Sequence, residues 1–414
     1  MANLEKTEER RVMMTWVLLV CTTLVIRMSG DIFTPSIALM AADLGISKAE
    51  ATSNLFYFYL WLMGSYVLFG RLCDCMPKKK LLLLSVTTCL VGCVMCALAP
   101  NIHVLNIGRS LQALATGCVL LTSQVWIGNF SDKNSMLGRL AWFTLITILS
   151  PILAPMIGGF ISDSLSWRYN FWLIALLCAI ALPVIGFTKI VDDTRQQEIG
   201  SIGNHIRQTL KGYRQVMLHS PIEHFSLVVQ GLFMAQATFS AISSFLFVQE
   251  FGVNATVLGL LFIPMVAGLI IGRFPTLYMR KRFSVRVAFV VNSIVVLLIT
   301  TILLTYYFLT GTHRIAEVII LLTVQSIGFG GLSILSLNNS MLVAEGNKGV
   351  ASGFYNFMNQ GFSLAGILLA QILFSFGLNA ISVFQCSVYQ VAVTTVVGLY
   401  LFLRKYPTYK DVLD

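Results

Sequence analysis

Two residues of opposite charge, Arg27 and Asp31, lie inside the first long apolar run of the chain. Residues four positions apart lie on the same side of a helix, so the two side chains can pair while their shared face turns away from lipid. A charge at bilayer depth costs about 2.5–3.5 kcal/mol, and such residues mark an internal pair or a pathway. Pro35 follows one turn later and lacks an N–H. It leaves the carbonyl of Asp31 without its helical partner, so we expect a kink beside the carboxyl group.

The composition predicts a membrane protein built around this stretch. Of the 414 residues, 57% are hydrophobic and 11% are charged, and the mean hydropathy is +0.80. A helix needs roughly 20 apolar residues to cross a bilayer, and the chain supplies about twelve such runs. The expected fold is an all-α membrane protein with twelve transmembrane helices in two six-helix bundles. What remains is too short for a catalytic domain, so we do not expect an enzyme.

The apolar runs fall into two groups of six on either side of one hydrophilic stretch. The expected spans are residues 13–40, 51–71, 80–99, 104–127, 140–162, 170–190, 222–248, 255–278, 285–309, 314–341, 350–375 and 381–403. The N-terminal bundle is then 1–190, the cytoplasmic linker 191–220 and the C-terminal bundle 221–414. The apolar residues of the linker suggest an amphipathic helix on the membrane surface. The first run is too long and too charged for a cleavable signal peptide.

Basic residues alternate with the expected spans and account for the net charge of +10. They gather at the N-terminus, in the even-numbered loops, for example Lys78–Lys80 and Arg280–Arg282, and at the C-terminus, whereas the odd-numbered loops hold only Lys48, Arg168 and Arg314. The positive-inside rule then places both termini in the cytoplasm, in an inner (plasma) membrane protein. The positive charge follows from topology, so no nucleic-acid partner is expected.

The sequence predicts neither a metal site nor a cofactor. The nine cysteines lie almost entirely within or beside apolar runs, and Cys93 and Cys96 are better explained as small packing residues than as ligands. There is no glycine-rich phosphate loop and no His-Glu-x-x-His motif.

A short pattern occurs once in each half. Gly70-Arg71-Leu72 precedes Lys78–Lys80, and Gly272-Arg273-Phe274 precedes Arg280–Arg282 at the same spacing. Two repeated halves are the architecture of secondary transporters, whose binding site lies between the halves near the middle of the membrane.

The loop Gly70-Arg-Leu-Cys-Asp74-Cys-Met-Pro-Lys78-Lys79-Lys80 resembles the G-x-L-x-D-R-x-G-R-R loop of the major facilitator superfamily. The resemblance implies a cytoplasmic latch between the two halves, formed here by Gly70, Asp74, Lys78 and Lys79. Cys75 and Pro77 replace the usual arginine and glycine, so the latch is expected to be weaker or differently shaped.

Two further motifs extend the resemblance. Arg109-Ser-Leu-Gln112 is similar to the family's R-x-x-Q-G pattern, which implies a role for Arg109 in proton transfer, with Asp31 as its partner. The alternative is that Arg109 extends to the nearer membrane surface. The fifth span contains Pro151, Pro155, Gly158 and Gly159 and is similar to the antiporter motif of exporters. The prolines predict a bendable helix, and the glycines allow another backbone to approach.

The resemblance covers essentially the whole chain and is closest to twelve-span drug:proton antiporters of the Bcr/CflA type. It implies an exporter of small amphiphilic organic compounds that works as a monomer, with protons, its substrate and the lipid bilayer as partners. The expected proton and substrate residues are Asp31, Arg27, Arg109 and Gln112. The candidates for a substrate cavity combine aromatic rings with amides; they are Tyr57, Trp61, Phe233, Gln236, Gln325 and Asn338.

Two other functions remain open. Arg27 and Arg109 would also suit an exporter of a metabolite made by the cell, such as a carboxylate-type siderophore, which secretion assays would separate from drug efflux. A membrane receptor or scaffold that does not transport would bind its ligand without proton-coupled flux.

Overall fold

The computed structural model describes residues 2–130, 139, 142–143, 146, 149–188, 202–219, 222–311, 314–343 and 348–413. Every regular element in these ranges is a helix, and ten of the helical stretches are long and apolar enough to cross a membrane. The predicted all-helical membrane fold is confirmed. The predicted second span coincides with the 28-residue helix α3, whereas the predicted fifth span is only partly described and ends in α7.

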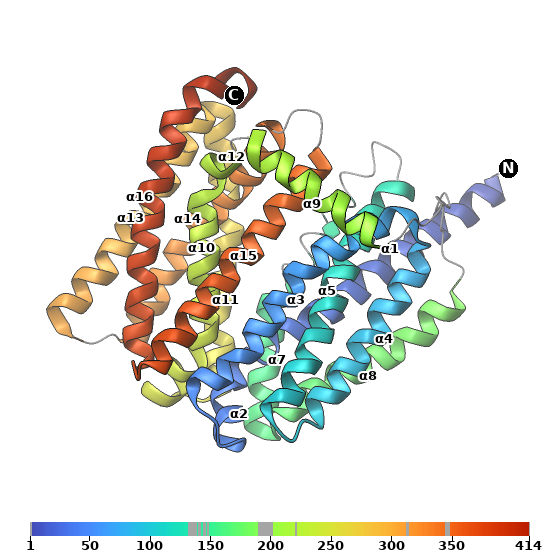
Figure 1. Cartoon of the computed structure of the whole chain (residues 1–414), viewed down its shortest axis with the longest axis horizontal. Helices are drawn as coiled ribbons and strands as arrows, with labels where there is room; N and C mark the ends of the chain where they lie inside the picture. Colours follow the sequence, from blue (N-terminus) through green and yellow to red (C-terminus); the bar gives the residue numbers. More distant parts are fainter. Residues whose placement is uncertain are drawn as a thin grey trace. The chain divides into compact units, whose positions relative to one another are not determined.

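The chain divides into two compact units, residues 1–46 with 53–209 and residues 47–52 with 210–414. The helices up to the central hydrophilic stretch are α1 (Ala2–Asp31), η1 (Thr34–Ser36), α2 (Ile37–Asp43), α3 (Lys48–Cys75), α4 (Lys78–Ala97), α5 (Ile102–Phe130), α7 (Ser150–Ser164) and α8 (Arg168–Phe187). Those that follow are α9 (Ile202–His219), α10 (Ile222–Ser244), η2 (Phe245–Glu250), α11 (Ala255–Ile271), α12 (Arg273–Arg282), α13 (Val285–Thr310), α14 (Ile315–Val343), α15 (Lys348–Ser375) and α16 (Ala380–Leu413) (Figure 1).

The first membrane span is broken beside Asp31, as Pro35 predicts. The last helical bond of this region runs from the Ile32 N–H to the Met28 carbonyl at 2.9 Å, and α1 ends at Asp31. A single turn of 3₁₀-helix follows, in which the Ser36 N–H donates to the Phe33 carbonyl at 2.9 Å. Helix α2 then continues the span to Asp43. The last carbonyl groups of α1 therefore lack helical N–H partners.

Helix α7 packs directly against this break. A Cβ atom on Gly158 would overlap the carbonyl group of Ile32, so only glycine permits the observed approach of the two backbones. Next to it, Ser36 and Ser162 share a hydrogen bond of 2.5 Å, and the Asn170 amide donates to both hydroxyls at 3.1 and 2.8 Å. Buried polar contacts thus join η1, α7 and α8.

The second unit packs around α10 and α14. Helix α10 lies against α15 and α16, whereas α14 lies against α11 and α13. A π-helical turn, η2, ends the α10 segment at Glu250, whose carboxylate accepts a 2.7 Å hydrogen bond from the Ala380 N–H at the start of α16. Stacked rings of Phe289 and Phe402, with centroids 3.9 Å apart, join α13 to α16.

Residues 202–219 of the predicted linker form the amphipathic helix α9. Thr209, Tyr213 and Val216 are buried at helical spacing, and Lys211 and Arg214 on the other side are exposed. Tyr213 packs against the rings of Phe354 and Phe357 of α15, with centroids 5.8 and 5.5 Å away. This packing explains why one face of α9 is apolar.

The approach at Gly158 makes a stability prediction. Gly158→Ala should lower the unfolding free energy of the purified protein by about 1–3 kcal/mol, because the new methyl group must displace the Ile32 backbone. Gly186→Ala in α8 is the matched control, since no atom lies within 4 Å of the added Cβ. Thermal unfolding in detergent compares the two variants, and equal midpoints would show that the break does not depend on this contact.

Candidate functional site

Arg109 of α5 is fully buried in the first unit. Its Nη1 atom donates to the Ser29 carbonyl at 2.7 Å and to the Gln112 side-chain oxygen at 2.8 Å, and its Nη2 atom donates to the Gly30 carbonyl at 3.1 Å. Gln112 is held in turn by a 3.1 Å hydrogen bond to the Cys93 sulfur. Arg109 is therefore fixed between α1 and α5 and does not extend to the membrane surface.

The break in the first span explains why Arg109 binds there. The carbonyl groups of Ser29 and Gly30 belong to the last turn of α1, which has no continuing helix to satisfy them. A cation at the C-terminal end of a helix is also favoured by the helix dipole. The Phe58 ring of α3 lies 4.5 Å from the guanidinium carbon and covers it. Arg109 thus caps α1 inside the protein.

The predicted pairing of Asp31 with arginine is not found. Within the described chain, no nitrogen of Arg27 or Arg109 lies within ion-pair distance of the Asp31 carboxylate. The physical reason is that Arg109 is engaged by backbone carbonyls. Asp31 instead accepts a 3.3 Å hydrogen bond from the hydroxyl group of Ser150. Arg27 is half-buried, and its Nε atom has no hydrogen-bond partner among the described residues.

Ser150 is the first residue of α7, so the acid at the end of α1 meets the start of a second helix. Pro151 occupies the first turn of α7, where a missing N–H is tolerated, and Pro155 lies inside the helix. Gly158 makes the backbone contact described above, and Gly159 beside it is buried. The four motif residues therefore lie on the helix that contacts both Asp31 and the break.

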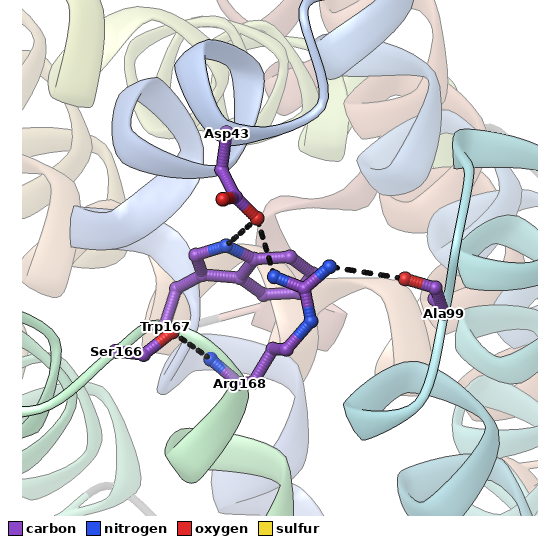
Figure 2. Close-up of polar contacts among 5 residues, drawn as sticks. All are labelled: Asp43, Ala99, Ser166, Trp167 and Arg168. Carbon is purple, nitrogen blue, oxygen red and sulfur yellow. Dashed lines mark hydrogen bonds and ion pairs between the residues drawn. The ribbon is translucent and has the colours of Figure 1, made fainter.

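A second polar cluster ties together the loops at one end of this unit (Figure 2). The Asp43 carboxylate at the end of α2 accepts hydrogen bonds from Arg168 and, at 3.1 Å, from the Trp167 indole N–H. Arg168 also donates to the Ala99 carbonyl at 3.2 Å, and its guanidinium carbon lies 4.2 Å from the Trp167 ring centroid. Arg168 thereby joins three connections between helices.

Aromatic rings connect this cluster to Arg109. The Phe33 ring lies 5.8 Å from the Trp167 ring and 5.1 Å from the Phe171 ring. The centroid of the same ring is 5.9 Å from the Arg109 guanidinium carbon. Phe33 belongs to the break itself, so its ring connects the break both to the buried arginine and to the tryptophan of the Asp43–Arg168 cluster.

A pocket of about 490 Å³ lies between α3 and α5. Its walls combine aromatic, apolar and neutral polar side chains, which are Tyr57, Trp61, His103, Asn106, Ile107, Ser110, Leu111 and Leu114. Two of the predicted cavity residues, Tyr57 and Trp61, thus line one pocket. The polar members from α5 are three to four residues apart and face α3 together.

Comparison with known proteins identifies the family. The model of the Major Facilitator Superfamily matches residues 19–367. The chain belongs to the major facilitator superfamily. It is therefore a multi-pass membrane transporter that binds small-molecule substrates, and not an enzyme.

The relatives of this major facilitator chain are distant. It is 22% identical over 378 residues to the chloramphenicol resistance protein CraA of Acinetobacter baumannii, covering 91% of this chain and 90% of the relative. It is 21% identical to multidrug resistance protein D of Escherichia coli over 267 residues, 64% of this chain and 66% of that protein.

Solved structures show the same fold at low sequence identity. A bacterial homologue of the human lysosomal transporter Spinster has a TM-score of 0.69 and 11% identity, covering 97% of each chain. A peptide transporter, POT, has a TM-score of 0.77 and 12% identity, covering 98% of this chain and 99% of that one. These likenesses concern the fold alone.

The predicted latch residues of the major facilitator loop have local contacts within the first unit. The Lys79 ammonium donates to the carbonyls of Gly186 and Thr188 at 2.9 and 3.0 Å, at the C-terminal end of α8. Lys78 is buried and donates to the Met76 carbonyl at 3.3 Å. Gly70 lies in α3, and the Asp74 side chain lies outside the described part of the structure.

The predicted cavity residues of the second unit have separate contacts and different exposures. Phe233 makes an edge contact with Phe329 at 5.1 Å, and Gln325 donates to the Thr300 hydroxyl at 3.3 Å. Gln236 is exposed and Asn338 is half-buried.

Sequence reasoning missed the ion pair between the connections of the helices and two polar residues of the pocket. Asp43 was not identified, although it is the acid nearest the end of the first span and Arg168 is one of only three basic residues in the odd-numbered loops. Asn106 and Ser110 were also missed, although with His103 they form a polar stripe at helical spacing in a predicted span.

The Asp43–Arg168 pair can be tested by a double-mutant cycle. Asp43→Asn keeps an acceptor for Trp167 and removes the charge, and Arg168→Gln removes the other partner. Both side chains are partly exposed, so we expect a coupling free energy of about 0.5–1 kcal/mol. Thermal unfolding at low and high salt measures it. Strictly additive effects would show that the pair does not couple the loops.

Proposed function

We propose that this chain is a proton-coupled exporter of small amphiphilic organic compounds in the inner (plasma) membrane, with both termini in the cytoplasm. The observation that carries the proposal is the position of Asp31, an acid inside a membrane span. Among the described residues, its hydrogen-bond partner is the hydroxyl of Ser150 and not an arginine. A carboxyl group that is not locked in an ion pair can gain and lose a proton during a transport cycle.

The contacts of Asp31 suggest how protonation acts on the helices. As a carboxylate, Asp31 accepts the hydrogen bond of Ser150 at the start of α7. Once protonated, it no longer needs this donor and can itself donate a hydrogen bond. Each proton transfer therefore changes the contact between the break in the first span and α7. Export would use this change to reorient the two halves, and the latch residues Gly70, Asp74, Lys78 and Lys79 would limit it on the cytoplasmic side.

The relatives support the export of drugs. CraA is named as a chloramphenicol resistance protein, and another relative as a multidrug resistance protein. The burial of Arg109 supports the same choice, because its Nη1 and Nη2 atoms are bonded to two backbone carbonyls and Gln112, and only its Nε atom lacks a hydrogen bond among the described residues. We propose chloramphenicol as the first probe and a monomer as the working unit.

Arg27 favours a second candidate function. This cation is half-buried, and its Nε atom has no partner among the described residues, so it suits an anionic metabolite such as a carboxylate-type siderophore. Secretion of siderophore by cells with and without the gene tests this candidate. A deletion that lowers secretion and leaves drug resistance unchanged would favour it over drug export.

Proton coupling is tested with Asp31→Asn in proteoliposomes. The wild type should accumulate chloramphenicol against its concentration when a proton gradient is imposed. Asp31→Asn keeps the shape and the acceptor for Ser150 but cannot titrate, so uphill transport should fall to the level of empty liposomes while exchange down a gradient remains. Asp43→Asn is the matched control and should keep uphill transport. Uphill transport by Asp31→Asn would place the proton site elsewhere, and binding without flux in the wild type would favour a receptor.

A further inference from the structure

The pocket between α3 and α5 has a chemistry that selects one class of ligand. Tyr57 and Trp61 supply two aromatic faces, 39% and 41% exposed, and Ile107 adds an apolar wall that is 54% exposed. Among the described residues, no Asp, Glu, Lys or Arg lines the pocket, and His103 is the one titratable group there besides the tyrosine. The walls therefore favour a flat, uncharged ring system over an anion or a phospholipid headgroup.

Asn106 supplies a polar group that lacks a partner. This side chain is only 7% exposed, and its Nδ2 atom donates to the Ser53 hydroxyl at 2.9 Å, but its Oδ1 atom has no hydrogen bond among the described residues. A buried amide oxygen without a partner is unfavourable. A ligand with an O–H or N–H group in the pocket would satisfy it. If the oxygen and nitrogen of the Asn106 amide exchange places, the Ser53 hydroxyl donates to the amide oxygen and the NH₂ group can donate to an acceptor of the ligand.

The pocket is separate from the charged residues on the other side of α5. Arg109 points to α1 and is covered by Phe58, whereas Asn106 and Ser110 on the same helix face the pocket. The pocket occupies the first halves of α3 and α5, so it lies toward the loops that contain few basic residues. A ligand bound there would not contact Asp31 or Arg109 directly.

We propose that the α3–α5 pocket binds neutral aromatic compounds that carry a hydroxyl or amide group, with the ring held by Tyr57 and Trp61 and the polar group bonded to Asn106. The proposal rests on the proposed export of amphiphilic compounds and names the substrate class of the first unit. A volume of about 490 Å³ is enough for a molecule of drug size and falls within the usual range for ligand pockets. Chloramphenicol, a neutral aromatic compound with hydroxyl and amide groups, is a suitable probe.

The test measures equilibrium binding of radiolabelled chloramphenicol to the full-length protein in detergent. Trp61→Ala should weaken binding by about tenfold or more, because it removes an aromatic anchor, whereas Trp61→Phe should keep most of the affinity. Trp172→Ala is the matched control, since Trp172 is 41% exposed on α8 and lies outside the pocket. Unchanged binding in Trp61→Ala would overturn the proposal and leave the transport function standing.

A second variant keeps the test decisive if Trp61→Ala fails to fold. Asn106→Asp places a carboxyl group in the pocket, so the ratio of affinities for the aromatic cation tetraphenylphosphonium and for chloramphenicol should rise by about tenfold. A ratio equal to that of the wild type would overturn the proposal. Native mass spectrometry gives a further check. If the wild type holds a lipid tightly and Trp61→Ala does not, a lipid occupies the pocket and the proposal is wrong.

This binding test is separable from the test of transport. Asp31→Asn should bind chloramphenicol with the affinity of the wild type, because Asp31 does not line the pocket. If Asp31→Asn loses uphill transport but still binds chloramphenicol, and if Trp61→Ala weakens binding, the results support the pocket as the binding site. If Trp61→Ala and Asn106→Asp both transport chloramphenicol as well as the wild type does, the proposed pocket is wrong and the proposed function stands.

Discussion

The carbonyl groups at the end of α1 set the constraint on which the first unit depends. Pro35 breaks the first span, and the last turn of α1 ends among buried residues where water cannot satisfy it. Arg109 supplies two of the missing hydrogen bonds from a neighbouring helix. Removing this cation would leave buried acceptors unsatisfied, so the break and the buried arginine require each other.

Arg109 of α5 and Asp31 of α1 have different partners in this arrangement. Arg109 holds the backbone at the end of α1, whereas Asp31 accepts a hydrogen bond from the Ser150 hydroxyl of α7. Gly158 brings α7 close enough for that contact, while the Ser36, Ser162 and Asn170 hydrogen bonds fix the far side of the break. In the described part of the chain, Arg109 and Asp31 thus have separate partners and do not form an ion pair.

Much of the fold was predictable from the sequence. Apolar runs located the spans, Pro35 located the break, and Gly158 indicated a close backbone contact. The partners of the charged side chains could not be predicted from the sequence. Arg109 bonds to backbone carbonyls, and every residue type has a backbone carbonyl. The Ser150–Asp31 and Arg168–Asp43 contacts join residues more than a hundred positions apart, and only folding brings them together. The Asn106 oxygen, which has no hydrogen bond among the described residues, likewise depends on what α3 places beside it.

We propose that Asp31, which forms no ion pair with an arginine in the described part of the chain, is the group that exchanges a proton when substrate binds. Infrared difference spectroscopy of the purified protein, with and without chloramphenicol, observes carboxyl protonation directly. The wild type should lose one protonated carboxyl band on binding, Asp43→Asn should lose the same band, and Asp31→Asn should lack it. A spectrum in which Asp31→Asn retains the band, or in which the wild type shows no carboxyl change, would contradict the account.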